Sequence, residues 1–184
     1  MVKQSGYKRR PADNYSKRGM DFENALNDMH QVYRAMGRGM VFKQYLPLRI
    51  VSHDSRGNLA QIIGRATVDF VGHVYGVPIA FDAKDVKGNT IPLSNLQPHQ
   101  LQDMIDNVRC GGVAFVLVRF ASRNVYRIPV QAWVIAKDAA DGYGCDEYDG
   151  FKATGLSSIR ESDIPKAWRI EGYDWADGIT AMKG

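Results

Sequence analysis

The stretch A-T-V-D-F-V-G-H-V-Y-G-V-P-I-A-F-D-A-K-D, residues 66–85, predicts two β-strands joined by a tight connection. Side chains alternate in character over residues 67–71 and again over residues 77–84, and a period of two is that of a strand. Gly72 and Gly76 bracket the connection, which we expect to be longer than the tightest hairpin turns. The stretch therefore predicts a β-hairpin at the centre of the fold.

Two carboxylates fall on neighbouring strands of this hairpin. Asp69 lies on the first strand, Asp82 on the second, and Lys84 follows Asp82 on the same side. Two acidic oxygen ligands suit a hard divalent cation such as Mg²⁺, with Mn²⁺ as a substitute. A lysine beside such a metal can hold a water nucleophile or offset the charge of a phosphorane-like transition state. Without its context, however, this spacing favours solvated hairpin charges over a metal site.

The composition bounds the class of protein. The chain has 184 residues, of which 45% are hydrophobic, so it can bury a sizeable core in one domain. It has no apolar run of the about 20 residues that cross a membrane and no signal-peptide pattern, so we expect a cytoplasmic protein without membrane contact. Cys110 and Cys145 lack metal-ligand spacing and are expected to be free thiols, and the four histidines are too scattered for a zinc site.

The charge is unevenly distributed along the chain. The net charge is +4 overall, with +5 over residues 1–18, +4 over residues 19–137 and −5 over residues 138–184. Residues 1–18 also lack apolar periodicity, so we expect a disordered basic arm there and a single folded domain over residues 19–184. The arm either binds a polyanion such as nucleic acid or only improves solubility. Its candidate DNA contacts are Lys8, Arg9, Arg10, Lys17 and Arg18.

The segment of residues 21–36 predicts an amphipathic helix. Its apolar residues recur at i, i+3, i+4 and i+7, Asp21 is the expected N-cap, and Gly37 and Gly39 follow its end. Glu23 lies in the first turn of this helix. Its carboxylate either stabilises the helix dipole or adds a further acidic group beside the metal site.

A second helix is predicted after the central hairpin. Ser94 or Asn95 is expected to cap it, Pro98 to lie in its first turn, and its apolar stripe to run over residues 101–108. Gln100 lies near its N-terminal end, off that stripe. The remaining elements are expected to be a buried strand over residues 113–120, a strand over 125–130, a short helix over 131–137, a loop over 139–160 and a tail that packs back on the core. This order predicts an α/β sheet with helices covering its faces.

A long hairpin is predicted before the central one. Residues 42–52 and 59–71 are rich in β-forming side chains and flank the turn sequence H-D-S-R-G-N, so a hairpin over about residues 41–66 should extend past the body of the fold. Its basic residues are Lys43, Arg49, Arg56 and Arg65. With Tyr45 and Leu46 they either enter a nucleic-acid groove or opening, or guard a sheet edge with charge.

Five motifs follow one another in an order that is far more specific than Asp-x-Lys alone. They are R-G-M-D-F-E (residues 18–23), T-V-D-F-V-G (67–72), F-D-A-K (81–84), L-x-N-L-x-x-H-Q (93–100) and G-G-V-A-F-V-L-V-R-F (111–120). A weaker similarity continues through S-S-I and the Tyr173-Asp174 pair. On these motifs the chain resembles the RecU family of Holliday junction resolvases, members of the PD-(D/E)xK nuclease superfamily. The resemblance implies a restriction-endonuclease-like α/β fold, with a mixed central sheet flanked by helices and a protruding β-hairpin stalk.

The resemblance also implies roles for the matching positions. The metal-site positions of the family are matched by Thr67, Asp69, Asp82 and Gln100. Its transition-state-stabilising lysine is matched by Lys84, and an acidic residue of its first helix by Glu23. The hairpin over residues 41–66 corresponds to the family's stalk, which is thought to enter the junction centre. The family acts as a dimer on branched DNA, and recombinase proteins are expected partners.

The chain departs from the family pattern in three ways. Asp82 stands where the family usually has Glu, and the shorter side chain can alter the position or choice of the metal. Phe70 replaces the usual Tyr. The stalk is several residues shorter, which bears on junction selectivity more than on nuclease chemistry.

The sequence therefore predicts a Mg²⁺-dependent endonuclease that resolves four-way DNA junctions by paired symmetric hydrolysis, as a homodimer with two active sites. One alternative is a restriction-like or flap endonuclease on the same core. Another is a DNA-binding recombination accessory protein without catalysis, and the complete set of Asp69, Asp82 and Lys84 argues against it.

Overall fold

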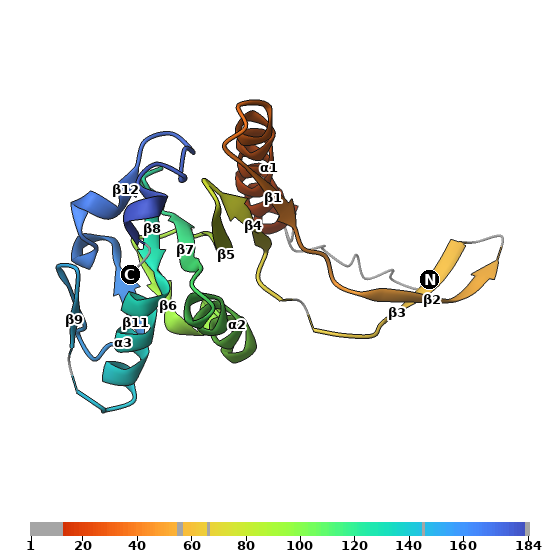
Figure 1. The fold of residues 1–184 in the computed structure, drawn as a ribbon. Coiled ribbons are helices and arrows are strands. Elements are labelled where there is room, and N and C mark those ends of the chain that lie inside the picture. The colour runs from red at the N-terminus through yellow and green to blue at the C-terminus, as the bar shows by residue number, and fades with distance from the viewer. Residues whose placement is uncertain (1–12, 55–56, 66, 145, 183–184) are drawn as a thin grey trace, which may run out of the picture.

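A six-stranded mixed β-sheet forms the centre of the protein (Figure 1). The computed structural model describes residues 13–54, 57–65, 67–144 and 146–182. Among the described strands of this sheet, β5 and β7 are parallel and the other neighbours are antiparallel. In spatial order the strands are β1 (Gly39–Lys43), β4 (Phe70–Val74), β5 (Val77–Asp85), β7 (Val113–Arg119), β8 (Val125–Pro129) and β12 (Arg169–Ile170). The predicted mixed sheet flanked by helices is confirmed.

Strand β7 divides the core into two layers. All of its side chains are buried, as expected for a strand covered on both faces. Val116 belongs to an apolar cluster with side chains of α2 (Pro98–Arg109) and α3 (Val130–Ala140). Phe115, one residue earlier, belongs to a second cluster with side chains of α1 (Asp13–Ala35) and the C-terminal segment. The period of two thus assigns α2 and α3 to one face of the sheet and α1 to the other.

Helix α1 begins at Asp13, before the expected start at Asp21. Lys17 and Arg18 therefore lie in the helix and not in a disordered arm. Gly19 does not end the helix, because a glycine costs about 1 kcal/mol relative to alanine, less than the burial of one large apolar side chain stabilises. The remaining candidate contacts of the arm lie outside the described residues: Lys8, Arg9 and Arg10. None of the helices in the described part of the chain is both long and apolar enough to cross a membrane.

The connection between β4 and β5 is shorter than expected. It is the two-residue turn Tyr75-Gly76, in which both residues have positive φ angles of 51° and 75°. Such turns match the twist of paired strands, but tyrosine rarely adopts this conformation, so the sequence gives little sign of it. Gly72 lies inside β4 and not in the turn. A Cβ atom there would lie 2.1 Å from the Met40 carbonyl oxygen, so glycine permits the close pairing of β1 with β4.

Helix α2 begins later than the expected caps. Ser94 and Asn95 belong to a short 3-10 helix, η1 (Leu93–Asn95), and the N-cap of α2 is Gln97. Gln97 and Gln100 form a reciprocal capping box, in which the backbone N–H of Gln97 donates to Gln100 Oε1 at 3.1 Å. Pro98 occupies the first turn, as predicted.

Strands β2 (Leu48–Asp54) and β3 (Gly57–Ile62) form a hairpin, here called the stalk, that projects from the body of the fold (Figure 1). The predicted protruding hairpin is confirmed. The two long strands expected over residues 42–52 and 59–71 are each interrupted, because β1 and β4 pair with each other in the central sheet. Pro47, which has no N–H to donate, lies in the interruption between β1 and β2.

The segment of residues 139–160 is not the continuous loop that we expected. It contains three short strands, β9 (Glu147–Tyr148), β10 (Phe151–Lys152) and β11 (Ser158–Arg160), and β11 pairs with β6 (Thr90–Pro92). Strands of two or three residues are too short for alternation to show in a sequence. The tail contains the 3-10 helices η2 (Glu161–Asp163), η3 (Lys166–Trp168) and η4 (Ile179–Met182). It packs back on the core as predicted, because Trp168 and Trp175 are buried.

A buried ion pair ties β5 and β7 to the first helix and to the tail. Arg119 Nη2 and Nε donate to the two carboxylate oxygens of Asp85 at 2.9 and 3.2 Å. The guanidinium carbon lies 4.7 Å from the ring centroid of Phe22 in α1, and Nη1 donates to the Tyr173 hydroxyl at 3.1 Å. The paired side chains are only 4% and 2% exposed. Arg119 therefore joins four separate segments of the chain.

We expect Arg119→Met to lower the free energy of unfolding by about 3–5 kcal/mol, because it removes the guanidinium group that donates two hydrogen bonds to the buried Asp85 carboxylate. Urea denaturation followed by tryptophan fluorescence measures the change. The double variant Asp85→Asn/Arg119→Met should regain much of the loss, since it removes both charges. Arg109→Met is the matched control, because its pair with Asp106 is exposed and should contribute less than about 1 kcal/mol. A double variant as unstable as Arg119→Met alone would contradict the prediction.

Candidate active site

Two carboxylates meet where β4 begins beside β5. Asp82 lies in β5 and is fully buried, and Asp69 directly precedes β4. Asp82 Oδ1 accepts a hydrogen bond from the backbone N–H of Asp69 at 3.2 Å, and Asp69 Oδ2 accepts one from the backbone N–H of Ala83 at 2.9 Å. Each carboxylate is therefore held by the backbone of the other strand. The structure brings Asp69 and Asp82 together, as the hairpin predicted, and their role in metal binding stays a prediction.

The second carboxylate oxygen of Asp82 is buried and lies against Lys84. Oδ2 accepts no hydrogen bond and contacts the ammonium group of Lys84 as an ion pair. Burial and, to a smaller extent, the negative charge of Asp69 together raise the pKa of Asp82 to about 7, against the opposing effect of Lys84. Ionisation of Asp82 is therefore less favourable here than in water. A cation bound here would favour the ionised form.

Gln100 supports Asp82 from the first turn of α2. Its amide nitrogen donates to Asp82 Oδ1 at 3.1 Å and to the carbonyl oxygen of Thr67 at 3.2 Å. Its amide oxygen accepts from the backbone of Gln97, in the capping box described above. The Thr67 side chain is exposed, so its carbonyl oxygen is the atom that faces the cluster. Gln100 and Thr67 thus lie at the site, where Gln100 positions Asp82, and their predicted role as metal ligands remains a prediction.

Glu23 reaches the same neighbourhood from α1 through Lys43. The ammonium group of Lys43 contacts Glu23 Oε2 as an ion pair. The hydrogen bond with Glu23 raises the pKa of Lys43, and the charge of Asp69 acts on it in the same direction. Lys43 lies in β1 of the central sheet and not on the projecting hairpin. The sequence does not indicate this contact, because the two residues are 20 positions apart and lie in different elements.

The other candidate DNA contacts belong to the stalk and to the chain that joins it to the body. Arg49 is an exposed residue of β2, and Arg65 is an exposed residue of the chain that returns from β3 to the body. Arg56 lies outside the described residues. The stalk is a separate two-stranded sheet, so its charges do not guard an edge of the central sheet.

The residues of the cluster fit a hard divalent cation. Within the described ranges, no group of three or more His, Cys, Asp and Glu side chains is arranged to hold a metal ion. Mg²⁺, however, commonly takes one or two carboxylates and keeps several waters. Asp69 and Asp82 supply two carboxylates, and the buried Asp82 Oδ2 already lies against a cationic group, the ammonium group of Lys84. The donor set therefore suits Mg²⁺ and does not suit a closed zinc site.

Comparison with known proteins identifies the family. The family model described as Recombination protein U (RecU) matches residues 17–143 of this chain. A Holliday junction resolvase RecU of Streptococcus pneumoniae is 33% identical over 171 residues, which cover 86% of this chain and 82% of that protein. The protein of the same name from Shouchella clausii is 38% identical over 117 residues, which cover 60% of this chain and 56% of that protein.

A third relative is the Holliday junction resolvase RecU of Limosilactobacillus reuteri, which is 34% identical over 167 residues and is covered to 74% of its length. The family match spans more than half of the chain and includes the positions of Glu23, Asp69, Asp82, Lys84 and Gln100. The family resemblance predicted from the motifs is therefore confirmed. The chain belongs to the RecU, or recombination protein U, family.

Proposed function

We propose that this protein is a metal-dependent endonuclease that resolves four-way DNA junctions. The observation that carries the proposal is the buried carboxylate of Asp82, which lies between Asp69 and the ammonium group of Lys84. Relatives in the same family are named Holliday junction resolvases. A carboxyl group with a raised pKa, beside a second carboxylate and a lysine, suits hydrolysis of a phosphodiester better than a structural role.

The residues divide the chemistry between them. Asp69 and Asp82 would hold Mg²⁺, or Mn²⁺ in its place, and Gln100 would keep Asp82 in position. The bound metal would lower the pKa of a water molecule and polarise the scissile phosphate. Lys84, whose ammonium group contacts Asp82, would stabilise the negative charge that develops on the phosphate. Glu23 would add an acidic group at the edge of the site through its contact with Lys43.

We propose further that the protein acts as a homodimer. A two-fold axis would place two such sites against two symmetry-related strands, as paired symmetric hydrolysis requires. The stalk supports an assembly, because four of its apolar side chains are between 57% and 63% exposed: Leu48, Ile50, Leu59 and Ile62. Arg49 and Arg65, at and beside the stalk, would supply salt-dependent contacts to phosphates.

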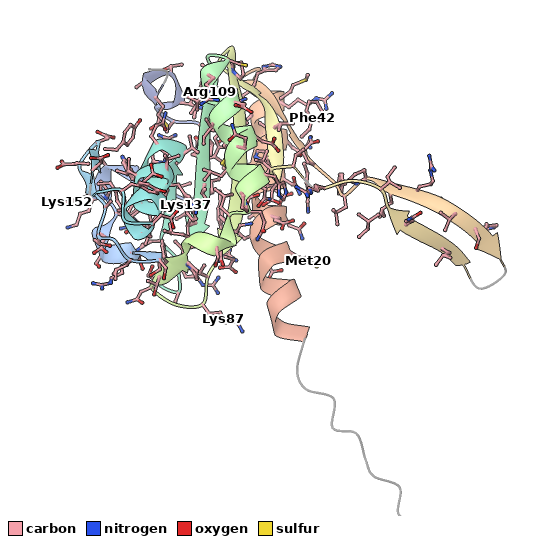
Figure 2. The ribbon with its side chains drawn as sticks, turned by 90° about the horizontal axis from the view of Figure 1, so that it is seen from below. Met20, Phe42, Lys87, Arg109, Lys137 and Lys152 are labelled. Atoms are coloured by element: carbon pink, nitrogen blue, oxygen red, sulfur yellow. The ribbon has the colours of Figure 1, made fainter. Side chains whose placement is uncertain are left out.

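We expect the protein to nick a labelled four-way junction symmetrically in Mg²⁺ and not in EDTA. Lys84→Ala should lower the single-turnover cleavage rate by about 10²–10³-fold, because it removes a charge aimed at the transition state. Junction affinity in a gel-shift assay should change far less. Lys152→Ala is the control, since Figure 2 shows Lys152 on the side of the molecule opposite to the stalk. An unchanged cleavage rate in Lys84→Ala would contradict the assignment of Lys84.

The same assay separates the alternatives when a duplex and a flap are cleaved in parallel. Nicks confined to the junction support a resolvase. Equal cleavage of the duplex supports a restriction-like endonuclease, and preferred cleavage of the flap supports a flap endonuclease. Binding of the junction without cleavage in Mg²⁺ or Mn²⁺ supports the non-catalytic accessory protein.

We expect Asp82→Asn to stabilise the metal-free protein at pH 8. The pKa of Asp82 is raised to about 7 from 3.8, so the folded state loses stability as the pH rises between these values and the buried group must ionise. Its melting temperature in EDTA should rise by about 3–6 °C at pH 8 and by less at pH 5.5. Mg²⁺ should raise the melting temperature of the wild-type protein and leave that of Asp82→Asn unchanged. A variant that is less stable than the wild type at pH 8 in EDTA would refute this account.

A further inference from the structure

The chain between β1 and the stalk is fixed beside the candidate active site. Residues 44–47 make this connection, which Figure 1 shows leaving the body of the fold toward β2. At one end the backbone N–H of Gln44 donates to the carbonyl oxygen of Asp69 at 2.7 Å. At the other end the carbonyl oxygen of Pro47 accepts from the backbone N–H of Ile63 at 3.0 Å. The connection is therefore held at both ends, and one end is held by a carboxylate residue of the site.

This connection presents an aromatic ring to solvent next to the catalytic cluster. Tyr45 is 78% exposed, and its ring centroid lies 5.7 Å from the ammonium nitrogen of Lys43. The same ammonium group contacts Glu23, and its pKa responds to the charge of Asp69. The ammonium group of Lys43 therefore links the Tyr45 ring to the Glu23 carboxylate, while most of Tyr45 remains exposed to solvent.

An exposed aromatic ring at this place suits one kind of ligand. Every nucleobase has a π-face, and stacking on an aromatic side chain needs no particular base. Where the arms of an open four-way junction meet, the terminal base pair of each arm has one face without a stacking partner, so an aromatic ring can stack there without opening a duplex. A scissile phosphate bound near Asp69 and Asp82 would bring the adjoining base within the reach of Tyr45.

We infer that Tyr45 stacks on a nucleobase of the bound DNA next to the scissile phosphate. This inference rests on the proposed nuclease function and adds to it a residue that positions the strand. Lys43, which contacts Glu23 and lies over the Tyr45 ring, would orient the ring toward the cut strand. Tyr45 takes no part in the proposed metal chemistry.

Photo-cross-linking tests the stacking directly. Single 5-iododeoxyuridine residues are placed at each position within three nucleotides of the cut in a four-way junction, and the complex is formed in Ca²⁺ without Mg²⁺. Irradiation should link one of these positions to Tyr45, as identified by mass spectrometry of the tryptic peptides. The same cross-link should persist in Tyr45→Phe, which keeps an aromatic ring, and disappear in Tyr45→Ala.

Binding gives a second readout with a matched control. Tyr45→Ala should weaken junction binding by about 5- to 100-fold, while Tyr45→Phe should bind within about twofold of the wild type. Tyr143→Ala is the control, since Tyr143 is 83% exposed and lies beyond the end of α3. It should leave both binding and cross-linking unchanged. Gel filtration checks that Tyr45→Ala keeps the oligomeric state of the wild type.

The outcomes separate this inference from the proposed function. A wild-type protein that binds no branched DNA would overturn both. Junction binding without any cross-link at Tyr45, or with equal affinity in Tyr45→Ala, would overturn the inference alone. A change of oligomeric state in Tyr45→Ala would also overturn it, because the ring would then belong to a contact between subunits. Loss of affinity and of the cross-link together, in a variant with unchanged oligomeric state, is the expected result.

Discussion

The burial of the Asp82 carboxylate is the constraint on which the candidate site depends. A carboxylate removed from water is costly unless charges and hydrogen bonds compensate for the lost hydration. The compensation comes from three parts of the chain: the backbone of Asp69 before β4, the amide of Gln100 in α2 and the ammonium group of Lys84 in β5. One buried group therefore links the pairing of β4 with β5 to the placement of α2. The same side chain takes part in the cap of α2, because the amide oxygen of Gln100 accepts a hydrogen bond from the backbone N–H of Gln97.

The two faces of β5 each carry a carboxylate in an ion pair, but the two pairs differ in which strands they join. On the face toward α2, Asp82 contacts the half-buried ammonium group of Lys84, on the same strand. On the face toward α1, Asp85 accepts two hydrogen bonds from Arg119, which also contacts Phe22. The Asp85–Arg119 pair joins two neighbouring strands, whereas the Asp82–Lys84 pair lies within one strand. Because successive side chains of a strand point to opposite faces, Asp82 and Asp85, three residues apart, lie on opposite sides of the sheet.

The residues that sequence analysis located correctly are those whose geometry is local. Asp69, Asp82 and Lys84 converge because a hairpin fixes their relative positions whatever the rest of the chain does. The turn at Tyr75 could not be predicted, because a positive φ at tyrosine depends on the pairing of the flanking strands. Pro47 was the available signal that the first long strand is interrupted. The pairing of Asp85 with Arg119 required knowledge of which strands are neighbours, and a continuous apolar run carries no such information.

The stalk and the candidate site share one stretch of backbone. A two-stranded hairpin is at best marginally stable alone, so the stalk depends on its base and on whatever covers its apolar side chains. Its base is attached through Gln44 to the carbonyl oxygen of Asp69. Asp82, by contrast, lies inside β5, between two paired strands of the sheet. Asp69 thus connects the two regions: its carboxylate accepts a hydrogen bond from Ala83 in β5, and its carbonyl oxygen accepts one from Gln44 at the base of the stalk. Any displacement of the stalk base would therefore reach the candidate site through the backbone of Asp69.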